Sequence, residues 1–351
     1  MEWGASGWKK KPEVIDALQA ILEDETGGNP MGGKKWTRMT AEKAAKCLRK
    51  LNIEISATTV RRLLNSLDYS LKSNRKCLSS GSSPNRDKQF GIIGDLREEF
   101  RQTGDPVISI DTKKKELIGL FKNAGRIWCV NSLPVNDHDF RSQADGIAAP
   151  YGLYDVNRNA GVLVVGMSAD TPEFAVNAIA TWWERHGREH YPQAKRLLLL
   201  ADSGGSNGAR PRAFKAYLQE KIADAYGLRV TVVHYPAGAS KWNPIEHRMF
   251  SEITKNWAGR PLESFEVLLN YARGSGTKTG LQIEAYLDER EYSKGHKISD
   301  KEFKKLNITT GEELGKWNYT IAPKVASETL VQPSKFAPPM STSTMMMAVN
   351  M

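Results

Sequence analysis

The sequence predicts an α/β protein, in which a mixed β-sheet flanked by helices is preceded by an all-α helix-turn-helix region. Apolar residues recur at helical spacing between residues 12 and 67, a pattern typical of amphipathic helices. From Asp105 onward, short apolar runs of strand length alternate with helical segments. Two strands joined by a tight turn and followed by strand–helix units favour a mixed sheet with helices packed on it. A length of 351 residues corresponds to about two domains.

Three helical segments are expected before residue 70, at residues 12–24, 40–51 and 57–67. The last two are separated by a short turn, which is the helix-turn-helix pattern. The outward face of the second helix of this pair carries polar and basic residues suited to the major groove of DNA, namely Thr58, Thr59, Arg61, Arg62 and Asn65. The alternative is a simple hairpin of two helices with a solvated basic face.

The expected elements of the second part follow a linker at residues 73–90 and a helix at 89–103. Apolar runs predict strands at 106–111, 116–121, 125–130, 150–156, 161–167, 196–202 and 228–235, the last of them being the final core strand. Helices are expected at 171–183 and 211–226, and a loop at 236–250 leads into a further helix.

The expected domain boundaries follow these changes of pattern. They are residues 1–33 for an N-terminal helix and loop, 34–80 for the helix-turn-helix domain, 81–104 for a linker and helix, 105–275 for the sheet domain, 276–325 for a C-terminal extension and 326–351 for a tail. The tail has no core pattern, so we expect it to be disordered.

Composition excludes several classes of protein. A hydrophobic content of 40% with 26% charged residues is ordinary for a globular chain. The three cysteines are far apart, which fits neither a disulfide framework nor a zinc site. The longest apolar runs are about half the length of a membrane span, and the start of the chain lacks the features of a signal peptide. The sequence therefore predicts a soluble, cytoplasmic protein with no membrane partner.

Charge indicates a polyanionic partner. The chain has a formal net charge of +10. Between Lys34 and Lys76 there are twelve Lys and Arg residues against three Asp and Glu residues, which accounts for nearly the whole excess. A basic excess concentrated on a predicted helix pair favours nucleic acid as the partner.

Three acidic residues occupy positions in the sequence that a β-sheet would bring to the same edge. Asp111 and Asp202 each follow a buried strand, and Glu246 lies in the first turn of the helix after the next strand. Such acids meet at the carboxyl edge of a sheet, where ligands bind. Their oxygen atoms suit Mg²⁺ or Mn²⁺, and two such ions support phosphodiester chemistry. Taken singly, each acid also fits a turn, a helix cap or a helix-dipole contact. Asp155 also ends a strand and is the alternative to Asp111.

Residues around Glu246 are candidates for contacts with DNA. Lys241 and Arg248 fit neutralisation of phosphates, and Trp242 fits stacking on an unpaired base. Trp242 equally fits the core.

Several motifs carry a resemblance to a known family. They are Asp202-Ser-Gly-Gly-Ser-Asn-Gly208, the segment from His234 to Ser251, Pro150-Tyr-Gly-Leu-Tyr-Asp155 and Trp317-Asn-Tyr-Thr-Ile321. Together they resemble the Rhodopirellula-type DDE transposase family of bacterial insertion sequences, over roughly Pro12 to Pro323. The tetrapeptide Asn243-Pro-Ile-Glu246 also resembles the acid motif of mariner-like transposases.

The resemblance implies an RNase H-like catalytic domain at residues 105–275, with Asp111, Asp202 and Glu246 as catalytic residues and as ligands of Mg²⁺ or Mn²⁺, two ions being expected. It implies a DNA transposase that binds transposon ends, cleaves a strand and transfers it to target DNA. The partners would be double-stranded DNA and further copies of the chain in a dimer or larger assembly, in association with the bacterial nucleoid. Relative to the family, the chain is expected to lack part of the region before Pro12. The alternatives are an RNase H-like nuclease of other specificity and a catalytically inactive DNA-binding relative.

Overall fold

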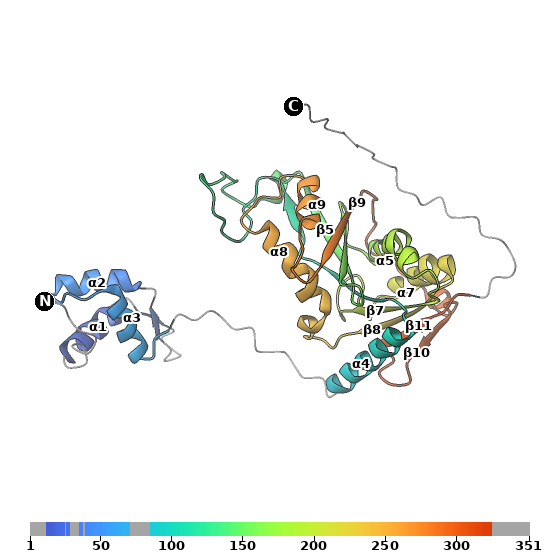
Figure 1. Cartoon of the computed structure of the whole chain (residues 1–351), viewed down its shortest axis with the longest axis horizontal. Coiled ribbons are helices and arrows are strands. Elements are labelled where there is room, and N and C mark those ends of the chain that lie inside the picture. The colour runs from blue at the N-terminus through green and yellow to red at the C-terminus, as the bar shows by residue number, and fades with distance from the viewer. Residues whose placement is uncertain (1–11, 25, 29–34, 38, 71–84, 325–351) are drawn as a thin grey trace, which may run out of the picture. The chain divides into compact units, whose positions relative to one another are not determined.

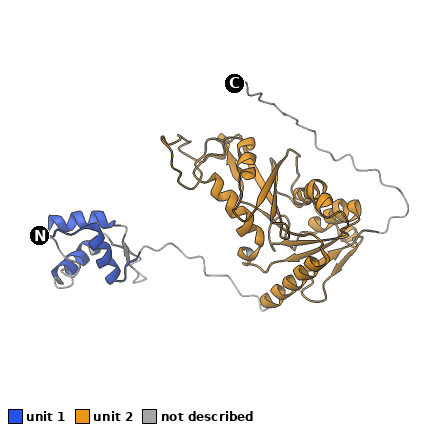
Figure 2. Ribbon diagram, viewed as in Figure 1, with its two compact units in different colours: residues 1–78 blue, residues 79–351 orange. Residues whose placement is uncertain are grey.

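The computed structural model describes residues 12–24, 26–28, 35–37, 39–70 and 85–324. The chain forms two compact units, residues 1–78 and 79–351, which are coloured separately in Figure 2. The predicted tail at 326–351 and most of the predicted linker lie outside the described residues. No helix in the described part of the chain is long and apolar enough to span a membrane.

The first unit contains the predicted helix pair. Helices α1 (Pro12–Asp24), α2 (Ala41–Lys50) and α3 (Ala57–Ser66) enclose a small core of Leu18, Leu48, Val60 and Leu63. The side chains of Thr40 and Ser56 accept hydrogen bonds from the first turns of α2 and α3, so each helix begins where its cap residue stands. The unit also contains a two-stranded antiparallel sheet, β1 (Thr26–Gly28) with β2 (Lys35–Thr37). The prediction of an all-α region was therefore incomplete, because these strands are too short to show a pattern.

The second unit is built on a nine-stranded mixed sheet (Figure 1). Its strands are β3 (Val107–Thr112), β4 (Glu116–Ile118), β5 (Gly146–Asp155), β6 (Ala160–Gly166), β7 (Arg196–Ala201), β8 (Arg229–His234), β9 (Gln282–Asp288), β10 (Ile308–Thr310) and β11 (Asn318–Ile321). The order is β10-β11-β8-β7-β3-β5-β6-β9, with β4 paired to β5. Strands β3, β7 and β8 are parallel, whereas β5 is antiparallel to β3 and to β6. The predicted mixed sheet is confirmed.

Helices cover both faces of this sheet. One face packs against α5 (Pro172–Trp182) and α7 (Arg212–Leu218), which continue into the π-helical segments η3 (Trp183–Gly187) and η4 (Gln219–Asp224). The other face packs against α4 (Arg86–Thr103), the π-helical turn η6 (Glu246–Phe250), α8 (Ser251–Trp257) and α9 (Phe265–Arg273). The remaining short helices are η2 (Arg141–Gln143), α6 (Arg188–His190), η5 (Ser240–Trp242) and α10 (Asp300–Phe303).

The sheet extends further along the chain than the sequence indicated. Strand β11 pairs with β8 and strand β9 pairs with β6, so β8 is not the final core strand. The boundary drawn at residue 275 therefore falls inside the sheet. The alternation of β9 is interrupted by half-buried residues, and β11 has four residues, so neither gives a clear strand pattern.

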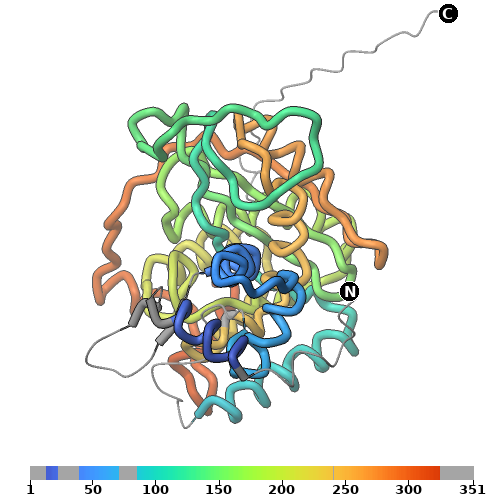
Figure 3. The backbone as a smooth tube through the Cα atoms, turned by 90° about the vertical axis from the view of Figure 1, so that its left-hand side faces the viewer, coloured from blue at the N-terminus to red at the C-terminus, as the bar shows by residue number. Residues whose placement is uncertain are grey.

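One predicted strand is absent. Residues 125–130 form no strand and lie in the long irregular segment between β4 and β5, drawn as teal and green loops in Figure 3. The apolar side chains of residues 125–130 are exposed, among them Trp128 and Val130. An apolar run of this length cannot by itself distinguish a buried strand from an exposed loop.

Candidate active site

Asp111 lies at the carboxyl end of the central strand β3. The alternating residues Ile108 and Ile110 are fully buried on the face covered by α5 and α7. Ser109 and Asp111 therefore project to the other face, because successive residues of a strand alternate. The Asp111 Oδ1 atom accepts a hydrogen bond of 2.8 Å from the backbone N–H of Thr112.

Asp202 follows β7, the parallel neighbour of β3. The register pairs Ile110 with Ala201, which brings Asp202 to the same edge of the sheet as Asp111. Its Oδ1 atom accepts a hydrogen bond of 3.2 Å from the Asn243 side-chain amide. Its backbone carbonyl accepts a bond of 2.9 Å from the imidazole of His234, which is fully buried. Asp202 is thus held through both its side chain and its main chain.

Glu246 is the first residue of the π-helical turn η6. The helix that continues into η6 begins at Pro244, a residue favoured in the first turn of a helix. Ile245, Met249 and Phe250 of this helix are buried against the sheet, which leaves Glu246 half-buried at the edge of the sheet. A π-helical turn is rare and is often found at functional sites.

The three carboxyl groups influence one another electrostatically. Burial raises the pKa of Asp111 to about 8, and the charges of Asp202 and Glu246 add to this effect. Burial also raises the pKa of Asp202, with a further contribution from Glu246, whereas the hydrogen bond from Asn243 acts in the opposite direction. Like charges that lie close together disfavour ionisation. The β3–β7 register and the hydrogen bonds of Asn243 to Asp202 and to the backbone of Glu246 place the three predicted acids at one edge of the sheet.

The chemistry of these donors fits a hard divalent cation. Carboxylate oxygens are the ligands that Mg²⁺ and Mn²⁺ prefer, and a cation between them would relieve their repulsion. As the carboxylates stand, no group of three His, Cys, Asp or Glu residues in the described part of the chain is close enough to form a ready-made metal site.

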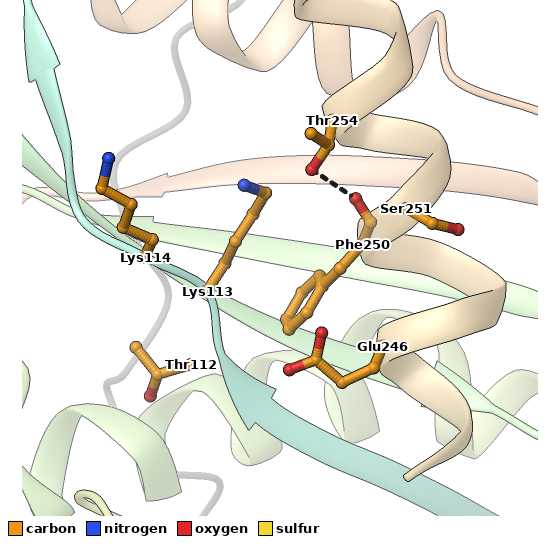
Figure 4. Close-up of a pocket in the computed structure, with 7 residues that line it drawn as sticks. All are labelled: Thr112, Lys113, Lys114, Glu246, Phe250, Ser251 and Thr254. Atoms are coloured by element: carbon orange, nitrogen blue, oxygen red, sulfur yellow. Dashed lines mark hydrogen bonds between the residues drawn. The ribbon is translucent and has the colours of Figure 1, made fainter. Parts of the chain in front are cut away.

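A pocket of about 470 Å³ adjoins Glu246 (Figure 4). It is lined by Thr112, Lys113, Lys114, Glu246, Phe250, Ser251 and Thr254. The Lys113 Nζ atom lies 4.6 Å from the centre of the Trp257 ring and 3.4 Å from Glu116 Oε1. Burial lowers the pKa of Lys113. Lys113 was not among the residues predicted from the sequence, although the run of three lysines that begins two residues after Asp111 was a signal that basic side chains lie near the acids.

The candidate DNA contacts around Glu246 lie at the surface. Lys241, Trp242 and Arg248 are exposed, and the Trp242 side chain is 56% exposed. This exposure excludes the alternative that Trp242 belongs to the core. The Trp242 ring meets the Phe90 ring edge-on at 5.9 Å, and Lys241 Nζ lies 5.4 Å from its centre.

The candidates in α3 occupy its outer face. Thr58, Arg61, Arg62 and Asn65 are exposed. Thr59 is half-buried, and its backbone N–H donates to the Ser56 hydroxyl that caps the helix. Arg61 forms an ion pair with Glu42 of α2.

Asp155 does not belong to the site. It pairs with Ile108 at the beginning of β3, so it lies at the opposite edge of the sheet from Asp111. Its Oδ2 atom accepts a hydrogen bond of 2.8 Å from the Tyr191 hydroxyl.

The sequence matches a known family over most of its length. The family described as Rhodopirellula transposase DDE domain matches residues 17–323. The chain belongs to this family. Membership of this DDE transposase family places it among enzymes of the polynucleotidyl transferase type, and its second unit has the predicted mixed sheet flanked by helices.

The chain is also similar to solved structures of Mos1 transposase. For the paired-end complex with left transposon end, the identity is 13%, the TM-score is 0.42, and the match covers 77% of this chain and 72% of that chain. For the pre-cleavage Mos1 transpososome the values are 12%, 0.41, 77% and 72%. For the Mos1 mariner paired end complex with Mn they are 13%, 0.40, 77% and 72%. A comparison with curated proteins gives no match.

Proposed function

We propose that the protein is an insertion-sequence transposase that binds transposon ends, cleaves DNA and joins the freed 3′-hydroxyl to target DNA, with Mg²⁺ or Mn²⁺ held by Asp111, Asp202 and Glu246. The observation that carries this proposal is geometric: parallel pairing of β3 with β7 brings Asp111 and Asp202 to one edge of the sheet, where Asn243, three residues before Glu246, donates a hydrogen bond to Asp202. The three acids come from two strand ends and a helix turn, in that order along the chain.

The residues at the proposed site have different roles, which follow from their positions. Two divalent ions in such a site supply activation of the attacking oxygen and stabilisation of the leaving oxygen. The three carboxylates bind and orient these ions, and His234 and Asn243 keep Asp202 in place. Lys113 faces the adjoining pocket, where its ammonium group neutralises a phosphate of the bound strand.

DNA recognition involves surfaces in both units. In the first unit, the exposed residues of α3 enter the major groove and its basic side chains contact phosphates. In the second unit, Lys241 and Arg248 contact phosphates beside the acids, and the exposed ring of Trp242 stacks on a base. Joining two transposon ends requires two copies of the chain on DNA, at the bacterial nucleoid.

The central test compares Asp202→Asn with Asp155→Asn. Both replace a partly or fully buried aspartate by its neutral isostere, but only Asp202 lies at the proposed site. With DNA that carries the element's ends and Mg²⁺ or Mn²⁺, we expect Asp202→Asn to lose cleavage by at least roughly 100-fold. Its DNA affinity should remain within about twofold of the original, and Asp155→Asn should cleave.

The products discriminate between the alternatives. Joined products indicate a transposase, whereas cutting without end sequences and without joining indicates a nuclease of the same fold. Cleavage by Asp202→Asn at the original rate would exclude the proposed site. Charge reversal of Arg62 should have the opposite effect to Asp202→Asn, because it removes a phosphate contact and leaves the chemistry intact.

A further inference from the structure

Asn243 is buried between the elements that carry the three acids. Its side chain is fully buried, and all its hydrogen-bonding groups face protein atoms. The Nδ2 group donates to Asp202 Oδ1 at 3.2 Å and to the Ile110 carbonyl at 3.4 Å. The Oδ1 atom accepts from the hydroxyl of Ser109. The orientation of the amide is fixed, because the reverse orientation would set its oxygen against a carboxylate and a carbonyl.

Ser109 completes the connection to the helix that carries Glu246. Its hydroxyl is fully buried and accepts a hydrogen bond of 3.1 Å from the backbone N–H of Ile245. The carbonyl of Asn243 accepts a bond of 3.2 Å from the backbone N–H of Glu246. The pair Ser109 and Asn243 thus contacts the strand of Asp111, the side chain of Asp202 and the backbone of Glu246.

We propose that Asn243 and Ser109 are positioning residues, which fix the carboxylates of Asp111, Asp202 and Glu246 relative to one another for cation binding. This inference rests on the proposed function. A carboxylate that carries a negative charge and lies among like charges tends to turn away, and the Asn243 amide is the donor that holds Asp202 in place. Groups that orient metal ligands commonly change metal affinity by roughly 10- to 100-fold when they are removed.

The two residues are built for this role by their size and position. Ser109 lies two residues before Asp111, on the same face of β3. Asn243 lies three residues before Glu246 and directly before Pro244, which has no N–H of its own to place. Because the side chains of Ser109 and Asn243 are short, they contact each other only when the helix of Glu246 begins directly over this part of β3.

The test measures Mn²⁺ binding to the full chain by electron paramagnetic resonance, without DNA, for Asn243→Ala and Ser109→Ala. Asn177→Ala is the matched control, because Asn177 is also buried and donates a hydrogen bond of 2.9 Å to Tyr292, away from the three acids. We expect Asn243→Ala to weaken Mn²⁺ binding roughly 10- to 100-fold. Asn177→Ala should bind Mn²⁺ as the original chain does, even where thermal unfolding shows that it has lost similar stability.

The result for Ser109→Ala keeps the inference testable if Asn243→Ala does not fold. Removal of this hydroxyl leaves Asp202 its donor but frees the amide to move, so we expect a smaller loss of Mn²⁺ affinity. Suppose that the original chain binds Mn²⁺ and cleaves DNA, and that those of Asn243→Ala and Ser109→Ala that fold bind Mn²⁺ equally well. The positioning role is then wrong and the proposed function stands. If the original chain itself binds no Mn²⁺, both are wrong.

Discussion

Gly152 lies directly opposite Asp111 in the antiparallel pair of β3 and β5, on the face where the helix of Glu246 packs. A Cβ atom at this position would meet the Phe250 ring and would lie 2.7 Å from Ile245 Cδ1. The absence of a side chain at residue 152 therefore lets η6 approach the sheet closely enough for Glu246 to reach the edge where Asp111 stands.

The first prediction concerns this close approach. Gly152→Ala should displace η6 and lower the free energy of unfolding by about 1–3 kcal/mol. The fractional loss of DNA cleavage should be larger than the fractional loss of stability. Gly91→Ala in α4 is the control, because a Cβ atom at Gly91 would meet nothing within 4 Å beyond the backbone of its own helix. Urea unfolding and cleavage assays measure both variants. Equal cleavage by the two would mean that the position of η6 does not depend on residue 152.

The second prediction concerns the repulsion between the acids. Because the pKa of Asp111 is raised to about 8 in the folded chain, its contribution to stability is fully present below the unfolded pKa of about 3.9 and is lost as the pH rises towards 8. In EDTA, Asp111→Asn should therefore exceed the original chain in stability at pH 8 by on the order of 2–4 kcal/mol, and by less at pH 5.

Thermal unfolding at the two pH values checks this expectation, with the exposed Asp95→Asn as the control. Added Mg²⁺ should stabilise the original chain more than Asp111→Asn. If the difference in stability between Asp111→Asn and the original chain does not depend on pH, the surroundings of residue 111 do not disfavour ionisation of its carboxyl group.

The third prediction concerns His234. Burial lowers the pKa of its imidazole to about 4. The stability that follows is present above the unfolded pKa of about 6.5 and is lost as the pH falls through the folded value. Between pH 6.5 and pH 4, the free energy of unfolding of His234→Gln, which keeps an amide donor, should therefore fall by about 3 kcal/mol less than that of the original chain. The exposed His190→Gln should follow the original chain, and identical pH profiles for all three proteins would contradict the prediction.

The fourth prediction separates two adjacent lysines. Lys113 is held over Trp257 at the pocket beside Glu246, whereas Lys114 is exposed. Lys113→Met should reduce the cleavage rate at saturating DNA roughly tenfold, the value of one hydrogen bond to a charged group. Lys114→Met should act mainly on DNA affinity. Cleavage rates and DNA affinities measured over a range of salt concentrations would separate the two effects. Equal losses of cleavage rate in the two variants would contradict the prediction.

The positions of the three acids in the fold were predictable where local pattern and chain order decided them. Asp111 and Asp202 each end a continuous apolar run, and parallel pairing of those runs brings their ends to one edge. Glu246 followed from its place in the first helical turn after the next strand. These features are visible in the sequence because strands and helices of this kind have a period.

The contacts that hold the site could not be predicted in the same way. Ser109 and Asn243 are 134 residues apart along the chain, and nothing in either local pattern indicates that they meet. The pairing of β11 with β8 likewise depends on a short strand that returns from far along the chain. Tertiary contacts between short polar side chains have no period, so only the folded chain shows them.

Strand β11 also encloses His234, whose backbone N–H donates to the Trp317 carbonyl at 2.9 Å. During synthesis on the ribosome, all three acids emerge well before this strand does. The enclosure of the imidazole that supports Asp202 therefore depends on a strand that is synthesised after all three acids.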